Sequence, residues 1–455
     1  MNIRAATSPL TRIDLNRPAA PVRIIHLGLG NFSRAHLAWY TTHAPDADRW
    51  GIAAFTGRSP DLADRLWPQN GLFHLVIRDP TGDRVELIDS LAAVHAADEH
   101  IAWLSYFADP AVCLVTSTIT EAGYRSADGR LATSDPAVAA DLAILRGDPA
   151  GPVGTAPAKF VAGLLARRDA GAGGISFCPC DNMPRNGDVV ATVIRDAAEA
   201  VDPTLTTWID EHVTFVTTMV DRITPRPDPH LGEFVAQVTG FADRAAVETE
   251  PFSEWVLSGR FAAGRPAWDA AGARFVDDIA PFERRKLHLL NGAHTLTAYP
   301  RPLLGCETVR DAIGHPVVGG WVEQWWTEAR RSIGLPAPEL DAYTDALRAR
   351  FANPRIRHLL TQIGADGSQK VPIRILPVLR AERDAGRPGD ASCRAVAAWV
   401  LHLRAGDAVH DSGVSGWDDV RTLPLPEAVA RVLRRIGVYD PDVARLVVTL
   451  AEEMT

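Results

Sequence analysis

A buried strand that runs directly into a glycine turn restricts the fold of this chain more than any other feature. The strand, Val22–Leu27, reads VRIIHL, and Gly28-Leu-Gly-Asn-Phe32 follows it at once, before a helix that continues through Tyr40. Strand, glycine turn and helix in this order are the setting in which a GxGxx(G) motif holds a pyrophosphate. Ser33 stands where the third glycine is usual, so the pattern allows either a nucleotide site or a turn without a ligand.

The end of the next predicted strand bears on the choice of nucleotide. Trp50–Thr56 is followed by Gly57, Arg58 and Ser59, and the first acid is Asp61, beyond a proline. An acid at this tip binds the ribose 2′-hydroxyl of NAD, whereas an arginine accommodates the 2′-phosphate of NADP. Arg58 therefore favours NADP, or tolerance of both cofactors, unless it only caps a turn.

The remaining N-terminal residues predict an α/β domain. Residues 129–157 are rich in glycine, proline and aspartate and are expected to form surface loops. Leu72–Val76 and Val85–Leu91 read as an antiparallel insertion. The other predicted elements are the strands Ala111–Ser117, Gly174–Cys178 and Val213–Val220 and the helices Asp98–Phe107 and Lys159–Asp169.

The character of the chain changes near residue 280, where strand-like runs give way to amphipathic stretches. We therefore expect two domains, residues 1–277 and 278–455, the second mostly helical. A polar loop across residues 353–372 is expected to interrupt these helices and to carry Lys370. The predicted helices are 316–333, 338–351, 390–404, 426–436 and 441–453.

Four polar residues share one side of the helix expected within Pro281–Pro302. At about 100° per residue, Glu283, Lys286, Asn291 and His294 fall on the same side, interleaved with leucines. A solvated face would carry mixed charges, so this pattern indicates the half-buried wall of a pocket, where a lysine can act as a base. A purely structural helix is the alternative.

Composition excludes several classes of partner. The formal net charge of −9 argues against nucleic acid or an anionic membrane as the main partner. No apolar run approaches the roughly 18 residues of a membrane span, and the N-terminus lacks a signal-peptide core. The 5 cysteines are scattered, with no CxxC and no HExxH, so we expect a cytoplasmic protein without a zinc site.

Six segments in sequence order together resemble the mannitol dehydrogenase family, the polyol-specific long-chain dehydrogenases. They span nearly the whole chain, which makes the combination specific although each segment alone is modest. The segments are GxGxFxRAH (28–36), STITEAGY (117–124), CDNMPRNG (180–187), FVTTMVDRITP (215–225), KLHLLNGAH (286–294) and DGSQKVP (366–372).

The resemblance implies a zinc-independent oxidoreductase with a Rossmann-type NAD(P)-binding domain and a mostly α-helical substrate domain. It implies that Lys286 is the general base and that Asn291 and Asn182 hold the developing alkoxide oxygen. It assigns His294 to orientation of the substrate hydroxyls and Glu283 to a proton relay. The family favours NAD as the cofactor. The residues that would contact it are Gly28, Leu29, Gly30, Asn31, Phe32, Arg58 and Thr118.

The resemblance leaves the substrate open. It assigns Lys370 and Asp221 to substrate binding, and it places Gln362 where mannitol-oxidising members can have an arginine, which is more similar to the fructuronate reductases. The leading expectation is a polyol such as mannitol or arabinitol with its ketose; the alternative is mannonate with fructuronate, which needs a spare cation, Arg374 or Arg357. A silent dinucleotide sensor is the third reading. We expect a monomer or small homo-oligomer.

Overall fold

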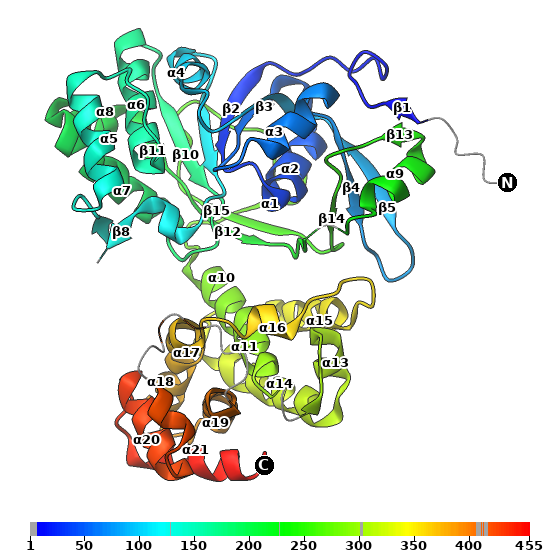
Figure 1. Ribbon diagram of the computed structural model, residues 1–455, viewed down its shortest axis with the longest axis vertical. Helices are drawn as coiled ribbons and strands as arrows, with labels where there is room; N and C mark the ends of the chain where they lie inside the picture. The colour runs from blue at the N-terminus through cyan, green and yellow to red at the C-terminus, as the bar shows by residue number, and fades with distance from the viewer. Residues whose placement is uncertain are drawn as a thin grey trace. The chain divides into compact units, whose positions relative to one another are not determined.

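The glycine turn follows the central strand of a six-stranded parallel sheet in the computed structural model (Figure 1). The structure describes residues 7–127, 129–226, 228–300, 304–405, 411, 413 and 417–455. The chain divides into two units, Met1–Ile279 and Ala280–Thr455, against a predicted boundary after residue 277. Each unit is described separately below.

The strand order of the parallel sheet is β11-β10-β7-β2-β3-β6. This order, in which the chain reverses direction across the sheet beside β2, is the doubly wound Rossmann arrangement and confirms the predicted fold class. Every residue of β3, β7 and β10 is buried, as expected for a sheet covered on both faces. The strands are β2 (Val22–Leu27), β3 (Gly51–Phe55), β6 (Leu91–His95), β7 (Leu114–Ser117), β10 (Ile175–Pro179) and β11 (Val213–Phe215).

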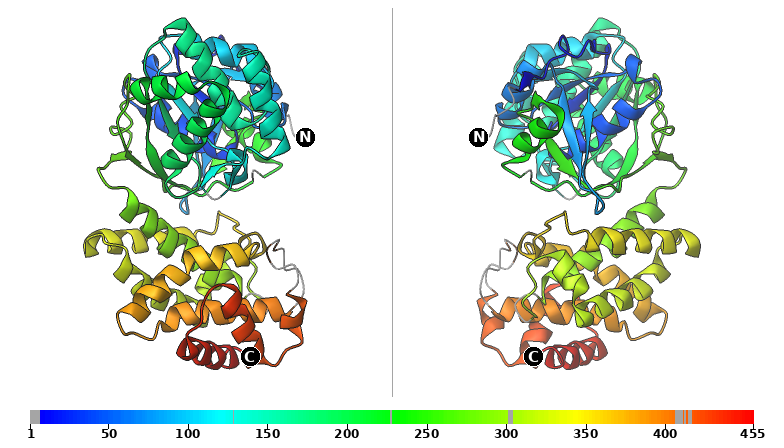
Figure 2. Two further views of the ribbon diagram at one scale, coloured as in Figure 1. Left: turned by 90° about the vertical axis from the view of Figure 1, so that its left-hand side faces the viewer. Right: turned by 90° about the vertical axis from the view of Figure 1, so that its right-hand side faces the viewer.

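Helices pack on both faces of this sheet (Figure 1 and Figure 2). One face is covered by α1 (Asn31–Ala35) and α2 (Leu37–His43), together with Trp255 and Trp268. The other is covered by α4 (His100–Ala108), α5 (Pro136–Gly147), α6 (Ala156–Ala170), α7 (Asn186–Val201) and α8 (Pro203–His212). The short helix α3 (Asp61–Leu66) follows β3.

The expectation of surface loops across residues 129–157 is wrong, because α5 lies within that range. Asp135 caps the helix by accepting from the main-chain N–H groups of Ala137 and Val138, and Pro136 occupies the first turn, where it is tolerated. Val138 and Leu142 are buried against the core, which stabilises a helix in a segment of unfavourable composition.

Two predicted strands are each divided between two sheets. The run Val85–Leu91 becomes β5 (Arg84–Ile88), antiparallel to β4 (Phe73–Ile77), and then β6 of the parallel sheet. The run Val213–Val220 breaks at Val216 into β11 and β12 (Thr217–Asp221). The smaller sheets also contain β14 (Val247–Thr249), β15 (Glu254–Ser258), β16 (Arg274–Phe275) and the pairs β1–β13 (Ser8–Pro9, Phe241–Ala242) and β8–β9 (Ser126–Ala127, Arg130–Leu131), and α9 (Leu231–Thr239) precedes β13.

The described part of the second unit is helical, apart from one isolated bridge between Thr308 and Leu359 (Figure 2). It begins with α10 (Ala280–Arg285), the π-helix η4 (Lys286–Gly292) and α11 (Ala293–Ala298). The five predicted helices correspond to α14 (Pro316–Ala329, extended by η5, Arg330–Ser332), α15 (Ala337–Ala352), α19 (Asp390–Ala405), α20 (Leu425–Arg435) and α21 (Pro441–Glu452).

The expected loop around Lys370 is wrong in part. Lys370 lies inside α17 (Gly367–Arg374), which contains Pro372 two residues before its end, and α16 (Leu360–Ile363) precedes it. The glycine turn and proline that suggested a loop are therefore accommodated within short helices. The prediction also omitted α13 (Val309–Gly314), α18 (Leu376–Asp384) and the short η7 (Asp418–Arg421).

In the part of the chain that the structure describes, no helix has both the length and the apolar character needed to cross a membrane. The cysteines Cys113, Cys178, Cys180, Cys306 and Cys393 are all buried and unpaired.

Candidate functional site

The glycine turn has a conformation that only glycine accepts at its first position. Gly28 has a φ of +100°, and a Cβ there would lie 2.4 Å from the carbonyl oxygen of Thr118. The N–H groups of Gly28 and Leu29 both donate to the Phe55 carbonyl at 2.9 Å, which fixes the turn against β3. The turn is therefore held between the ends of two neighbouring strands.

Ser33 has a local role that explains why the third glycine is not required. The Gly30 N–H donates to Ser33 Oγ at 2.9 Å, and the Ser33 hydroxyl donates back to the Gly30 carbonyl at 3.3 Å. A Cβ on Gly30 would meet no atom closer than the Gly28 carbonyl oxygen, at 3.6 Å. That side of the turn is open to a ligand, as close approach of a pyrophosphate requires.

His26, which the motifs did not single out, supports the turn from below. Its ring is buried within β2, with Nδ1 at 2.9 Å from Thr116 Oγ1 and Nε2 at 3.1 Å from Thr118 Oγ1. The Thr118 hydroxyl in turn donates to the Gly28 carbonyl at 2.8 Å. Burial lowers the pKa of His26 to about 3, so the ring is neutral. A histidine that follows two isoleucines within the strand was the available signal.

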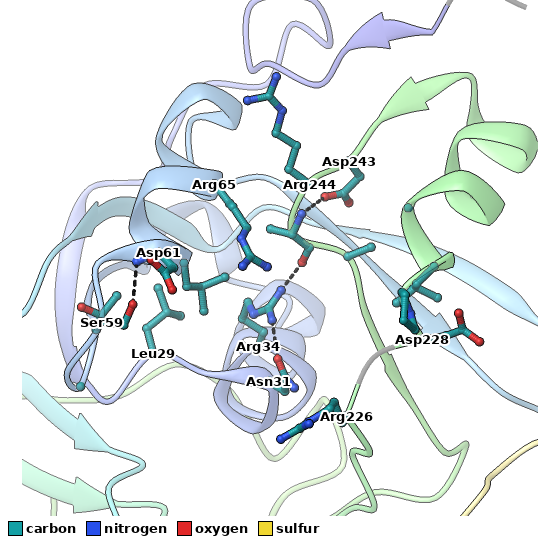
Figure 3. A pocket seen from close by; sticks show the side chains of 18 of the residues that line it. Leu29, Asn31, Arg34, Ser59, Asp61, Arg65, Arg226, Asp228, Asp243 and Arg244 are labelled. Atoms are coloured by element: carbon teal, nitrogen blue, oxygen red, sulfur yellow. Dashed lines mark hydrogen bonds between the residues drawn. The ribbon is translucent and has the colours of Figure 1, made fainter.

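Two cavities meet at the tip of β3. A cavity of about 620 Å³ is lined by Gly28, Leu29, Arg58 and Thr118, and extends toward α5 and α6. A cavity of about 710 Å³ shares Leu29, Gly57 and Arg58 with it and adds Asn31 (Figure 3). Five of the seven predicted cofactor residues therefore line these cavities, whereas Gly30 and Phe32 line neither. The open turn and adjoining cavity fit a dinucleotide.

The loop after β10 carries Asn182 and is fixed on both sides of it. Asp181 is buried, and its carboxylate accepts from Ser117 Oγ at 2.8 Å, from the Ile119 N–H at 2.6 Å and from the Tyr124 hydroxyl. Burial raises the pKa of Asp181 to about 6, because hydrogen bonds only partly offset desolvation. Asp181 and Tyr124 were not predicted as site residues, although both lie in the quoted motifs.

Asn186 fixes the far end of the same loop. Its Nδ2 donates to the Asp181 carbonyl at 3.0 Å and to the Thr218 carbonyl at 2.9 Å, while its Oδ1 accepts from the Thr218 N–H at 2.9 Å. Asn182 is itself exposed between these anchors. Asp221, the other predicted site residue in this region, is buried at the end of β12.

The helix with the four predicted catalytic residues is not a regular α-helix. Residues Lys286–Gly292 form a π-helix, in which hydrogen bonds join residues five apart. Lys286 and Asn291 are therefore one turn apart on the same face. The assumption of about 100° per residue is wrong across this segment. Glu283, Lys286 and Asn291 are half-buried, as the interleaved leucines predicted.

Two tryptophans of α14 stabilise this π-helical turn. The Trp325 indole donates to the His288 carbonyl at 2.8 Å, and the Trp326 indole donates to the Leu289 carbonyl at 2.9 Å. Gly292 allows the close approach, because a Cβ there would lie 2.4 Å from the Trp325 ring. The irregular carbonyls are thereby satisfied within a buried environment.

His294 is buried beyond the π-turn, with its ring 4.8 Å from the Phe351 ring and 4.9 Å from the His358 ring. Burial, followed by the charges of nearby residues, lowers its pKa well below the usual range. The ring is therefore neutral, with one nitrogen able to donate and the other to accept. Its Nε2 has no hydrogen-bond partner in the described part of the chain.

Lys370 and Arg374 lie one turn apart on α17, near His294. The Lys370 ammonium donates to the carbonyls of Ile363, at 3.1 Å, and Ala365, at 2.5 Å. Arg374 donates to Thr295 Oγ1 at 3.3 Å. Burial, and then Arg374, lowers the pKa of Lys370. Gln362 is exposed on α16.

The fold and these sites define the class. The first unit has the strand order, glycine turn and adjoining cavity of a Rossmann-type dinucleotide-binding domain, and the second is a helical domain with a lysine, an asparagine and a neutral histidine on one helix. The Mannitol dehydrogenase Rossmann domain matches residues 22–270, and the Mannitol dehydrogenase C-terminal domain matches residues 278–453. The chain belongs to the mannitol dehydrogenase family.

Similar proteins include both polyol and sugar-acid enzymes. D-mannonate oxidoreductase of Escherichia coli (strain K12) is 35% identical over 88% of this chain and 83% of its own. Mannitol 2-dehydrogenase of Cereibacter sphaeroides is 34% identical over 84% of this chain and 80% of its own. The Pseudomonas fluorescens mannitol 2-dehydrogenase, solved as a ternary complex with NAD and D-mannitol, is 29% identical, with a TM-score of 0.79 over 96% of this chain and 91% of that one.

Proposed function

We propose that this chain is a zinc-independent oxidoreductase that interconverts a polyol and its ketose, of the mannitol and arabinitol class, with NAD(P). The observation that carries the proposal is the π-helical turn, which places Lys286 and Asn291 one turn apart in a mannitol dehydrogenase C-terminal domain. The buried, neutral His294 follows on α11. The names of the relatives support a substrate with several hydroxyl groups.

The residues have distinct tasks in this proposal. A nicotinamide dinucleotide, which Gly28, Leu29 and Thr118 would help to hold, would supply a hydride acceptor for oxidation and a hydride donor for reduction. Lys286 removes the hydroxyl proton, and Glu283, three residues earlier, passes that proton toward solvent. The amide of Asn291 donates an N–H group to the oxygen as negative charge develops on it. His294 binds a neighbouring hydroxyl through its unpartnered nitrogen.

A substrate panel tests the activity. The purified protein is incubated with NAD(H) or NADP(H) and with mannitol, arabinitol, sorbitol, mannonate or fructuronate, and absorbance of the reduced nicotinamide is followed. Turnover that persists in EDTA is expected with at least one polyol. Loss of turnover in EDTA would contradict the zinc-independent mechanism, and inactivity with every compound would favour another substrate or a dinucleotide sensor.

Replacement of the base tests the mechanism. We expect Lys286→Ala to lower kcat for oxidation at least about a hundredfold, because positioned proton transfer contributes that much or more. Dinucleotide affinity should persist, since the glycine turn lies in the other unit. Arg284→Ala is the control, because that guanidinium donates to the Ile333 carbonyl. Near-normal turnover by Lys286→Ala would remove this lysine as the base.

A second candidate, a sugar acid as substrate, is favoured by Arg374. Lys370 and Arg374 are partly buried, and in the described residues neither has a carboxylate within salt-bridge distance. Asp366 and Asp411 are the nearby acids, and Asp411 already accepts from the Ser368 N–H and hydroxyl. Two such cations favour an anionic ligand. Arg357, the other cation considered, is exposed and 4.0 Å from Glu307.

The two substrate classes are separated by Arg374→Gln. If mannonate is the substrate, this change raises KM for mannonate about tenfold or more and leaves KM for mannitol nearly unchanged, because only the acid has a charge to lose. Arg357→Gln is the matched control. Equal effects of Arg374→Gln on mannitol and mannonate would leave the polyol as the supported substrate.

A further inference from the structure

The cavity of about 710 Å³ beside the glycine turn has more basic than acidic residues in its lining (Figure 3). It opens next to the dinucleotide cavity and shares Leu29, Gly57 and Arg58 with it. Its charged lining consists of Arg34, Arg58, Arg65, Arg226 and Arg244 with Asp61, Asp228 and Asp243. This excess of cations raises the question of what neutralises them.

Two of the three aspartates have other partners. The Asp243 carboxylate accepts from the His74 N–H at 2.6 Å, from His74 Nδ1 at 3.0 Å and from Gln69 Nε2 at 3.0 Å. Asp228 accepts from the His230 N–H at 2.7 Å, within its own turn. Asp243 also offsets part of the charge of Arg34, so the five arginines of this lining still outnumber its three aspartates.

The guanidinium groups of Arg34 and Arg65 face one another across the cavity (Figure 3). Arg34 is buried, with 3% of its surface exposed, and donates to the carbonyls of Gly30 and Ala245 and to Asn31 Oδ1. All these acceptors are neutral. Burial lowers the pKa of Arg34 to about 10; the charge of Asp243 opposes this shift, and the charge of Arg65 adds to it less strongly. A buried cation whose own hydrogen-bond acceptors are all neutral, beside a second arginine, favours a bound anion.

Arg58 and Ser59 lie where this cavity adjoins the predicted position of the adenosine ribose. Neither Arg58 nor Arg65 has a carboxylate within salt-bridge distance in the part of the chain that the structure describes. Ser59 Oγ accepts from the Asp61 N–H at 3.1 Å, which leaves the Ser59 hydroxyl hydrogen available as a donor. Along the chain after β3, the hydrogen-bond donors Arg58 and Ser59 therefore come before the first acid, Asp61.

We propose that this cavity binds the 2′-phosphate of NADP(H), and that NADP(H) is the preferred cofactor. The inference rests on the dinucleotide-dependent function proposed above. In a Rossmann-type domain the adenosine ribose reaches the tip of the second strand, here Gly57–Ser59, so its 2′-substituent points at this cavity. Arg58 and Arg65 bind the phosphate oxygens, Ser59 donates a further hydrogen bond, and Arg34 supplies charge behind them.

An alternative arrangement, in which the site prefers NAD(H), would use Asp61. If its carboxylate accepted the ribose 2′-hydroxyl, the same tip would select NAD(H) and would repel a phosphate. The two arrangements predict opposite orders of affinity, so nucleotide binding alone separates them.

The primary test measures by calorimetry how tightly each nucleotide binds to the wild-type protein. NADPH is expected to bind about tenfold or more tightly than NADH, and 2′,5′-ADP by the same margin more tightly than 5′-AMP, with the preference shrinking as salt is added. Equal affinity, or tighter NADH, overturns the inference while the proposed oxidoreductase stands. Failure of both dinucleotides to bind overturns both proposals.

Matched variants locate the phosphate. Arg58→Ala and Arg65→Ala should each lower the affinity for NADPH about tenfold or more. Each should change the affinity for NADH by less than about threefold. Arg244→Ala is the control, because its side chain lines the same cavity but points away from Arg34 and Arg65 (Figure 3). Equal weakening of NADPH and NADH by Arg58→Ala and Arg65→Ala would overturn the assignment. The nucleotide comparison on the wild type remains decisive if a variant does not fold.

Discussion

Asp181 shows how one buried carboxylate can position a neighbouring group. It joins the end of β7, through Ser117 and Ile119, to Tyr124, while the adjacent Asn182 stays exposed. Desolvation opposes its charge, and the three donors oppose desolvation. Because burial is the larger effect, its folded pKa of about 6 lies above the ordinary 3.8.

Asp181→Asn should therefore change the pH dependence of stability. Between pH 3.8 and about 6 the folded protein binds more protons at this site than the unfolded chain, so the site's contribution to stability is full below 3.8 and is lost as pH rises through 6. The loss is at most about 3 kcal/mol. Denaturant unfolding across this range should show a steeper decline for the wild type than for Asp181→Asn. Parallel curves would contradict the raised pKa.

At the scale of elements, the π-helical turn depends on a neighbouring helix. Its carbonyls at His288 and Leu289 accept from the two indoles of α14, and Gly292 leaves room for the Trp325 ring. An unsatisfied buried carbonyl is costly, so these donors help to select the π form over a regular helix. The spacing of Lys286 and Asn291 is thus a property of the pair of helices.

Trp325→Phe and Trp326→Phe test that dependence. Each keeps an aromatic ring but removes the indole donor, and should lower the free energy of unfolding by about 1–3 kcal/mol. We also expect a lower kcat, because Lys286 and Asn291 would no longer be held in register. Trp321→Phe, on the same helix, is the control. Unfolding in denaturant gives the stability, and steady-state kinetics gives kcat; unchanged values for both variants would contradict the role of the indoles.

At the scale of the whole molecule, the predicted site residues are divided between two units. The glycine turn, both cavities at the tip of β3 and the Asn182 loop belong to Met1–Ile279, whereas Lys286, His294 and Lys370 belong to Ala280–Thr455. A ligand stabilises the segments that bind it, so nucleotide binding can be followed along the chain.

Hydrogen exchange gives that measurement. At a dinucleotide concentration of 100 times Kd, the linked stabilisation is about 2.7 kcal/mol. Peptides that cover residues 22–35, 51–59 and 114–120 should exchange more slowly than without nucleotide, since these segments form the turn and the cavities. Mannitol alone is the control. No added protection in these segments would place the nucleotide elsewhere.

Local patterns predicted much of this molecule. The run Val22–Leu27 with Gly28, and the amphipathic C-terminal stretches, predicted the fold class, because burial imposes a period that the sequence displays. The assumption of about 100° per residue was wrong across Lys286–Gly292, because indoles far away in sequence help to select the π form. The division at Val216 depends on which sheet each half joins. The site roles of Lys286, Asn291 and Asn182 stay predictions.

Arg65 could not have been predicted as part of a site. It lies on α3, outside every quoted motif, and gains significance only because folding brings it opposite Arg34. Convergence of residues from separate elements leaves no local pattern in the sequence.

The hydrogen bonds of Ser33 have a consequence for how quickly and at what entropic cost a nucleotide binds. Because Ser33 already closes the turn at Gly30, hydrogen bonds hold the main chain there before a ligand arrives. Ser33→Gly would restore the usual third glycine yet loosen the empty turn, so a residue that departs from the signature makes the site more rigid than the signature itself would.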